Sequence, residues 1–241
     1  MGKEAEEVGE AEKISAILFD MDGVLIDSAA VIERAWSEAA QQFGRRITAD
    51  DLRNHIHGQP GPHTIRALFH DLSRADQEKV QAHVMHVENT ADYAPIRGVE
   101  RLIAHLHGAG VTIGIVTSGW RSKVDRVIAL LRAESCISVI VERNDVTRGK
   151  PYPDPYLLAA ERLNLPSSKT LVFEDAPSGV TSAVTAGAYC VGIGEADLLR
   201  SGAKITIRDF EGVKVQEHPN GPMLSCRPGH RLFVERRSVR V

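Results

Sequence analysis

The sequence contains few cysteines, and their spacing fits neither a disulfide framework nor a metal site. Cys136, Cys190 and Cys226 are the only three among 241 residues, and they lie far apart. Small disulfide-stabilised domains carry even numbers of cysteines, and zinc sites use close pairs of cysteine or histidine. The cysteines therefore favour a reducing compartment, in which they are free thiols.

Long apolar runs and an excess of positive charge are also absent. No stretch approaches the roughly 20 apolar residues that span a membrane, and the acidic first residues are unlike the basic start of a signal peptide. The formal net charge of -3 provides no broad basic surface for nucleic acid or an anionic membrane. We therefore predict a cytoplasmic protein, expected to be a monomer, that binds neither nucleic acid nor membrane.

Short apolar segments alternate with helical patterns along most of the chain. Strand-like runs occur at residues 14–19, 111–116, 139–141, 170–173 and 189–193, and apolar residues at helical spacing lie between them. Neighbouring parallel strands need a crossover about one helix long, so this alternation favours βαβ units. We therefore predict an α/β fold in which helices cover both faces of a parallel sheet.

One stretch, residues 28–94, interrupts this alternation and shows only helical patterning. Thr48 and Ser73 stand at positions typical of helix N-caps, with Asp51 and Asp76 three residues after them. We therefore expect a separate insert made of several short helices.

These patterns divide the chain into four parts. We predict a disordered acidic tail at residues 1–13, an α/β core at 14–27 and 95–211, the helical insert at 28–94, and an extension at 212–241. The extension mixes proline and glycine with basic residues and has no clear periodicity. We expect it to be loosely packed, with an interaction arm as the alternative.

Acidic residues follow two of the predicted strands. Asp20 and Asp22 come directly after the first strand, just before Gly23, and Glu174 and Asp175 follow the strand at 170–173. Such a pair alone is more often a turn or a helix cap. The carboxyl ends of parallel strands meet at the edge where ligands bind, and converging carboxylates repel one another unless a cation lies among them. Oxygen ligands favour a hard ion, so we predict Mg²⁺.

Two further strand ends carry groups that could bind phosphate. Thr117, Ser118 and Gly119 offer a hydroxyl and backbone amides before a helix start, and Lys150 follows the fourth strand. Taken singly, the first is typical of an ordinary N-cap and the second of a surface lysine. Together with the acidic pairs, they predict a phosphate site at the same edge.

These strand-end motifs resemble those of the haloacid dehalogenase-like (HAD) phosphohydrolase superfamily. The similarity covers roughly residues 14–207 and implies a Rossmann-like core with an inserted helical cap domain. The segments Gly149-Lys150-Pro151-Tyr152-Pro153 and Phe173-Glu174-Asp175-Ala176-Pro177 are most similar to those of sugar-phosphate and glycerol-phosphate phosphatases and of β-phosphoglucomutase-like enzymes.

The resemblance implies a role for each motif residue. Asp20 would be the nucleophile that forms an aspartyl-phosphate, and Asp22 the general acid and then the general base. Asp20, the backbone carbonyl of Asp22 and Asp175 would bind Mg²⁺, with Glu174 in or just behind that shell. The phosphoryl oxygens would be held by the side chain of Thr117, the amides of Ser118 and Gly119, and Lys150.

The cap of the resembling phosphatases contacts the leaving group, and here its most polar cluster includes His57, His63 and Arg66. We predict that these residues bind the substrate, although a solvated helix face is an equally good interpretation. The predicted function is the Mg²⁺-dependent hydrolysis of a small phosphorylated metabolite, a sugar phosphate or glycerol phosphate.

Three other functions are compatible with parts of this pattern. A phosphomutase of the β-phosphoglucomutase type would share the motifs and the cap, although Thr117-Ser118-Gly119-Trp120 is more similar to the phosphatases. A dehalogenase would not need the second acid, Asp22. A catalytically inactive phosphate-binding module could keep the fold without the reaction.

Overall fold

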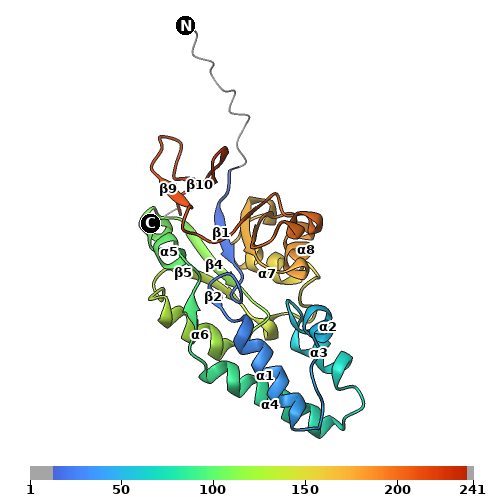
Figure 1. Cartoon of the computed structure of the whole chain (residues 1–241). Coiled ribbons are helices and arrows are strands. Elements are labelled where there is room, and N and C mark those ends of the chain that lie inside the picture. Colours follow the sequence, from blue (N-terminus) through green and yellow to red (C-terminus); the bar gives the residue numbers. More distant parts are fainter. Residues whose placement is uncertain (1–12, 238–241) are drawn as a thin grey trace.

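A six-stranded parallel sheet lies at the centre of the computed structural model, which describes residues 13–237 (Figure 1). Its strand order is β5-β4-β1-β6-β7-β8. The strands are β1 (Ala16–Phe19), β4 (Thr112–Val116), β5 (Ile137–Val141), β6 (Thr170–Glu174), β7 (Tyr189–Ile193) and β8 (Ile205–Ile207). The predicted α/β class is confirmed, and β8 is a sixth strand that the apolar runs did not reveal.

Helices cover both faces of this sheet, as Figure 1 shows. The first face packs against α5 (Val99–Gly108) and α6 (Arg121–Leu130), and the second against α7 (Asp154–Arg162) and α8 (Pro177–Thr185). Side chains of a strand alternate between faces, so Ile17 and Phe19 of β1 join the first apolar cluster and Leu18 joins the second. Short 3₁₀ turns complete the core at Arg143–Asp145, Ser167–Lys169 and Ala196–Ser201.

The segment between β1 and β4 contains the predicted helical cap. Its helices are α1 (Ala29–Gln41), α2 (Ala49–Asp51), a π-helical turn at Leu52–Ile56, α3 (Gly61–Leu68) and α4 (Arg74–Thr90). They enclose an apolar cluster of their own, in which Trp36 stacks on Phe69 with ring centroids 6.1 Å apart. Both predicted caps are present, because the side chains of Thr48 and Ser73 accept hydrogen bonds from the amides of Asp51 and Asp76.

The cap joins the core through a short antiparallel pair, β2 (Ile26–Asp27) and β3 (Ala94–Pro95). The sequence pattern did not predict these two-residue strands. They bring the entry and the exit of the cap side by side, so both chain connections of the cap leave the core at one place.

The prediction that the extension after residue 212 is loosely packed is wrong. Its residues form an antiparallel sheet of β9 (Lys214–Gln216), β10 (Met223–Arg227) and β11 (His230–Phe233). Leu224 and Cys226 of β10 are buried in the first apolar cluster, and Val234 pairs with Ile14 beside β1. The apolar positions alternate over only five residues between turns, which is too short a pattern to stand out.

Residues 1–12, which make up nearly all of the predicted acidic tail, lie outside the described part of the chain. Among residues 13–237, no helix combines the length and the apolarity that a membrane span requires.

Candidate active site

The carboxyl ends of β1, β4 and β6 meet below the helical cap. Phe19 of β1 pairs with Ile115 of β4 and with Phe173 of β6, so the residues that follow these strands lie next to one another. A cavity of about 540 Å³ opens there between the sheet edge and the cap. It is lined by all the core residues predicted from the strand ends: Asp20, Asp22, Thr117, Ser118, Gly119, Lys150, Glu174 and Asp175.

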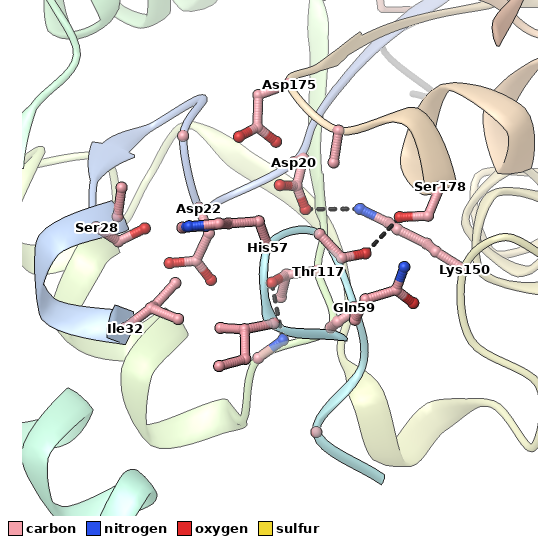
Figure 2. Close-up of a pocket in the computed structure, with 18 of the residues that line it drawn as sticks. Asp20, Asp22, Ser28, Ile32, His57, Gln59, Thr117, Lys150, Asp175 and Ser178 are labelled. Atoms are coloured by element: carbon pink, nitrogen blue, oxygen red, sulfur yellow. Dashed lines mark hydrogen bonds and ion pairs between the residues drawn. The ribbon is translucent and has the colours of Figure 1, made fainter. Parts of the chain in front are cut away.

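Lys150 is the centre of the acidic floor of this cavity. Its Nζ donates to Asp20 Oδ1 at 2.6 Å, to Glu174 Oε1 at 2.5 Å and to the carbonyl oxygen of Val116 at 3.1 Å. Tyr156 on α7 donates its hydroxyl to the same Glu174 oxygen at 2.5 Å. All three side chains that surround Asp20 in this network are buried. The network fixes Asp20 in one orientation at the end of β1 (Figure 2).

The floor holds more negative charge than Lys150 balances. Burial raises the pKa of Asp20 to about 7, against the attraction of Lys150 and with the help of Glu174 and Asp22. Burial, together with the charges of Asp20 and Glu174, also raises the pKa of Asp175 well above its ordinary value. A nearby cation would favour the charged form of both carboxylates.

The donor set fits a hard divalent cation. Carboxylate oxygens of Asp20, Glu174 and Asp175 lie within 4.8 Å of one another. Oxygen-only ligands suit Mg²⁺, which binds through one or two carboxylates and completes its shell with water and phosphate oxygens. Because Glu174 Oε1 already accepts from Lys150 and Tyr156, Asp20 and Asp175 are the carboxylates best placed to hold the ion.

Gly23 lets Asp175 come close to the turn after β1. Its φ of +73° is in the left-handed region, and a Cβ at this position would lie 1.9 Å from Asp175 Oδ2. Its amide closes the turn by donating to the carbonyl oxygen of Ile26 at 2.9 Å. A glycine is therefore needed here for both conformation and space.

The predicted phosphate loop follows β4 into α6. The hydroxyl of Thr117 accepts a hydrogen bond from the amide of Gly119 at 3.0 Å, so this amide, which we predicted to face phosphate, has an internal partner. A Cβ on Gly119 would lie 2.7 Å from Met21 Cε. The loop is thus packed tightly against the turn that carries Asp20 and Asp22.

Asp22 belongs to a second buried network, on the cap side of the cavity. Lys123, in the first turn of α6, donates from Nζ to Asp22 Oδ1 at 2.7 Å and to Glu88 Oε2 of α4 at 2.9 Å. Burial opposes the charge of Lys123, but Asp22 and Glu88 outweigh it and raise the pKa of its ammonium group. The carboxylate of Asp22 is not part of the acidic group around Asp20.

Three residues of these networks were not predicted from the sequence: Lys123, Glu88 and Tyr156. Lys123 lies six residues after Thr117, among the apolar residues of a predicted helix. This position could have indicated a paired lysine, because buried lysines are rare unless paired. No sequence pattern indicated Glu88 or Tyr156, since each contacts its partner only through packing between helices and strands.

Of the three predicted cap residues, the structure brings only His57 to the cavity. Its Nε2 lies 3.0 Å from Glu33 Oε1. His63 and Arg66 lie on α3 and are not among the lining residues, and His63 Nε2 is 3.3 Å from His55 Nδ1. The cap lines the cavity with four apolar side chains, Ile32, Trp36, Ile56 and Val84, and with four polar ones, Arg53, His57, Gln59 and Glu88.

Several known proteins are similar to this chain. A model of the haloacid dehalogenase-like hydrolase family matches residues 17–193. Hexitol phosphatase A of Escherichia coli (strain K12) is 33% identical over 216 residues, which cover 88% of this chain and 99% of that protein. Glycerol-1-phosphate phosphohydrolase 1 of Saccharomyces cerevisiae is 29% identical over 224 residues, or 86% of each protein.

The structural comparison extends to the cap. The crystal structure of a HAD hydrolase of family IA, variant 3, from Entamoeba histolytica has a TM-score of 0.72 at 26% sequence identity, and the match covers 83% of this chain and 96% of that one. The similarity therefore includes the core and the inserted helices together.

Proposed function

The chain belongs to the haloacid dehalogenase-like hydrolase family, and we propose that it hydrolyses a small phosphorylated metabolite through an aspartyl-phosphate on Asp20. The family and its phosphatase relatives bear out the predicted enzyme class, a phosphoric monoester hydrolase. The finer steps below are our proposal.

The observation that carries this proposal is the position of Asp20. Its carboxylate is buried at the end of β1, held by Lys150 at 2.6 Å and adjacent to the phosphate loop at Thr117. An oriented, buried carboxylate beside a lysine and a phosphate-binding loop can attack phosphorus and form a covalent intermediate. Lys150 would offset the negative charge of the phosphoryl oxygens, and Thr117 and the amide of Ser118 would help to bind them.

Asp22 is proposed as the acid and base of the reaction. It lies two residues from Asp20, and its carboxylate faces the cap side of the cavity, where a leaving group would lie (Figure 2). There it can protonate the departing alkoxide, and afterwards it can take a proton from the water that attacks the aspartyl-phosphate.

Mg²⁺ is the proposed cofactor, held by Asp20, Asp175 and the backbone carbonyl of Asp22. When bound, it would supply the positive charge that lets a carboxylate approach a phosphate ester. Glu174 supports this site through Lys150 and Tyr156, each 2.5 Å from its Oε1.

The cap side of the cavity suits a leaving group with an apolar face. Trp36 and Ile32 of α1 line it with an aromatic ring and a branched apolar side chain, and Arg53, His57, Gln59 and Glu88 add polar groups from the cap. Sugars and polyols combine CH faces, which pack on aromatic rings, with hydroxyl groups, which form hydrogen bonds. We therefore propose a sugar phosphate or a related polyol phosphate such as glycerol phosphate, with His57 as a polar contact from the cap.

The direct test is phosphate release from a panel of hexose, hexitol and glycerol phosphates, compared by kcat/KM with and without Mg²⁺. Asp20→Asn should abolish turnover, and Asp22→Ala should reduce it by roughly 10²–10⁴-fold. Asp27→Asn is a matched control, because Asp27 also lines the cavity but is not part of the acidic group around Lys150. Near-normal activity of Asp20→Asn would exclude Asp20 as the nucleophile.

Two alternatives have distinct outcomes in the same assays. A phosphomutase would convert a sugar monophosphate into its isomer when primed with the bisphosphate and would release little free phosphate. An inactive binding module would release no phosphate from p-nitrophenyl phosphate at any Mg²⁺ concentration.

The proposed enzyme is a cytoplasmic monomer. Cys136, Cys190 and Cys226 are free thiols, and burial raises the pKa of Cys226 to about 12, which keeps this thiol protonated and unreactive. Light scattering of the purified protein would test the oligomeric state.

A further inference from the structure

Lys123 is a buried cation that lies beside the proposed phosphate site without belonging to it. Its side chain is 1% exposed, although lysine is rarely buried without a purpose. Its Nζ contacts one carboxylate from the core, Asp22, and one from the cap, Glu88, at 2.7 and 2.9 Å. It also lies over the ring of Tyr93, 5.2 Å from the centroid. The ammonium group therefore connects the two parts of the molecule at the cavity wall.

The surroundings of Lys123 hold it in one place. The neighbouring Ser122 donates to Asn89 Oδ1 at 3.0 Å, and Arg126, one turn later in α6, donates to the carbonyl oxygen of Ala91 at 2.9 Å. Both partners lie at the end of α4 or directly after it. These hydrogen bonds hold the first turns of α6 against the cap segment that carries Glu88. Lys123 therefore has little freedom to follow Asp22 if Asp22 moves.

The carboxylate of Asp22, by contrast, is held mainly by one interaction, its contact with Lys123. The side chain of Asp22 is 27% exposed, compared with 10% for that of Glu88, so Asp22 faces the cavity more openly than Glu88 does. Figure 2 shows the Asp22 carboxylate apart from the pair of Asp20 and Lys150, on the side of Ile32 of α1. Lys123 is the side chain that holds it there.

We propose that Lys123 is a positioning residue, which orients the carboxylate of Asp22 toward the leaving group and links that orientation to the cap through Glu88. This inference rests on the proposed function, because it assumes that Asp22 protonates the leaving group. Lys123 is not among the residues that line the cavity and acts through Asp22, whose Oδ1 it contacts. It acts by keeping the proton donor on the leaving-group side, where a misplacement of about 1 Å can cost on the order of 10²-fold in rate.

A matched pair of substrates separates this role from a structural one. The leaving group of p-nitrobenzyl phosphate is an alkoxide, which must be protonated as it departs. The leaving group of p-nitrophenyl phosphate is a stable phenolate, which needs little help from an acid. Their kcat/KM values report the steps up to phosphoryl transfer, so the ratio of the two values measures how well the acid is placed.

Lys123→Met should lower kcat/KM for p-nitrobenzyl phosphate by about 10–100-fold and change that for p-nitrophenyl phosphate by much less. The single variant also leaves Glu88 buried without a partner, which can weaken the fold. The double variant Lys123→Met with Glu88→Gln removes that unpaired charge. It should recover thermal stability and still show the lowered ratio, because Asp22 remains without its anchor.

Two results would overturn the inference. A double variant with the wild-type ratio would mean that Lys123 only neutralises Glu88, and equal losses for both substrates in Lys123→Met would mean a general disturbance of the site. Asp22→Asn serves as the reference for the proposed function. If this variant also loses activity equally on both substrates, the acid role of Asp22 is wrong. If it loses mainly the benzyl ester while Lys123→Met does not, only the role of Lys123 is wrong.

Discussion

The raised pKa of Asp20 has a direct consequence for stability, which can be measured without a substrate. Burial raises this pKa from 3.8 to about 7 in the folded protein. In the unfolded chain the carboxyl group loses its proton near its ordinary value, whereas the metal-free folded protein retains it up to neutral pH. Between these two pH values the folded state binds more protons than the unfolded state, so the free energy of unfolding falls as pH rises.

The size of the effect follows from the shift. A difference of one pKa unit corresponds to about 1.4 kcal/mol, so a rise from 3.8 to about 7 amounts to roughly 4 kcal/mol for Asp20 alone. The stabilising contribution is fully present below about pH 4 and is lost as pH rises through about 7. Asp175 and Glu88, whose pKa values are also raised by burial, add to the loss with the same sign.

Urea unfolding of the metal-free protein between about pH 5 and 8 would measure this loss, with Asp20→Asn as the comparison. The asparagine variant cannot titrate at this position, so the stability of the wild type should fall more steeply by up to about 1.4 kcal/mol per pH unit. Only the slopes are compared, because replacing the carboxyl group by an amide also shifts the whole stability curve. Parallel curves for the two proteins would refute the reasoning, since Asp20 would then be ionised throughout. Saturating Mg²⁺ should reduce the extra slope of the wild type by displacing the proton.

Two further predictions concern the glycine turn and the C-terminal sheet. Gly23→Ala should weaken Mg²⁺ binding, measured as the concentration needed for half-maximal activity, because its Cβ would collide with Asp175 Oδ2; Gly44→Ala is the matched control, with a φ of +66° but no atom within 4 Å of its Cβ. Leu224→Ala should lower the free energy of unfolding by about 2–5 kcal/mol, as expected for a buried leucine. Replacing its half-buried neighbour Met223 by alanine should lower the free energy of unfolding clearly less. If urea unfolding showed equally small decreases for both variants, this sheet would not stabilise the core.

The fold class could be predicted because parallel α/β proteins repeat one simple pattern. Each fully buried strand of the core, such as Thr170–Glu174, is a short apolar run followed by a helical pattern. The strand Ile205–Ile207 has only three residues, and two of them are half-buried, so no period is visible. The pair formed by Ile26–Asp27 and Ala94–Pro95 is shorter still. Its existence depends on the cap bringing distant segments together, which no local pattern records.

The same distinction applies to the site. Asp20, Lys150 and Asp175 follow strand ends, and the topology of a parallel sheet gathers such residues at one edge. Their common cavity could therefore be predicted before any side chain was placed. Glu88 and Lys123 are 35 positions apart on two helices, and their contact depends on how the cap rests on the core. Periodicity could identify the helices but not which of their polar residues would meet.

Two buried lysines, Lys150 at the cavity floor and Lys123 beside the cavity, balance the charge of carboxylates in the core and in the cap. Each lysine serves two carboxylates: Lys150 holds Asp20 and Glu174, and Lys123 holds Asp22 and Glu88. Asp20 directly follows β1 and Glu174 ends β6 of the same sheet, so the proposed nucleophile is oriented by the core alone.

The partners of Lys123 come from the core and from the cap, so the orientation of the proposed acid depends on where the cap lies. It follows that Glu88→Gln alone, which keeps a hydrogen-bond acceptor for Lys123, should disturb Asp22 less than the loss of Lys123 does. Replacing Glu174 should instead affect Asp20. The buried Lys150, which both carboxylates contact, would then lose one of its two negatively charged partners. In the proposed mechanism, a change in the cap can therefore alter proton transfer to the leaving group without altering attack on phosphorus.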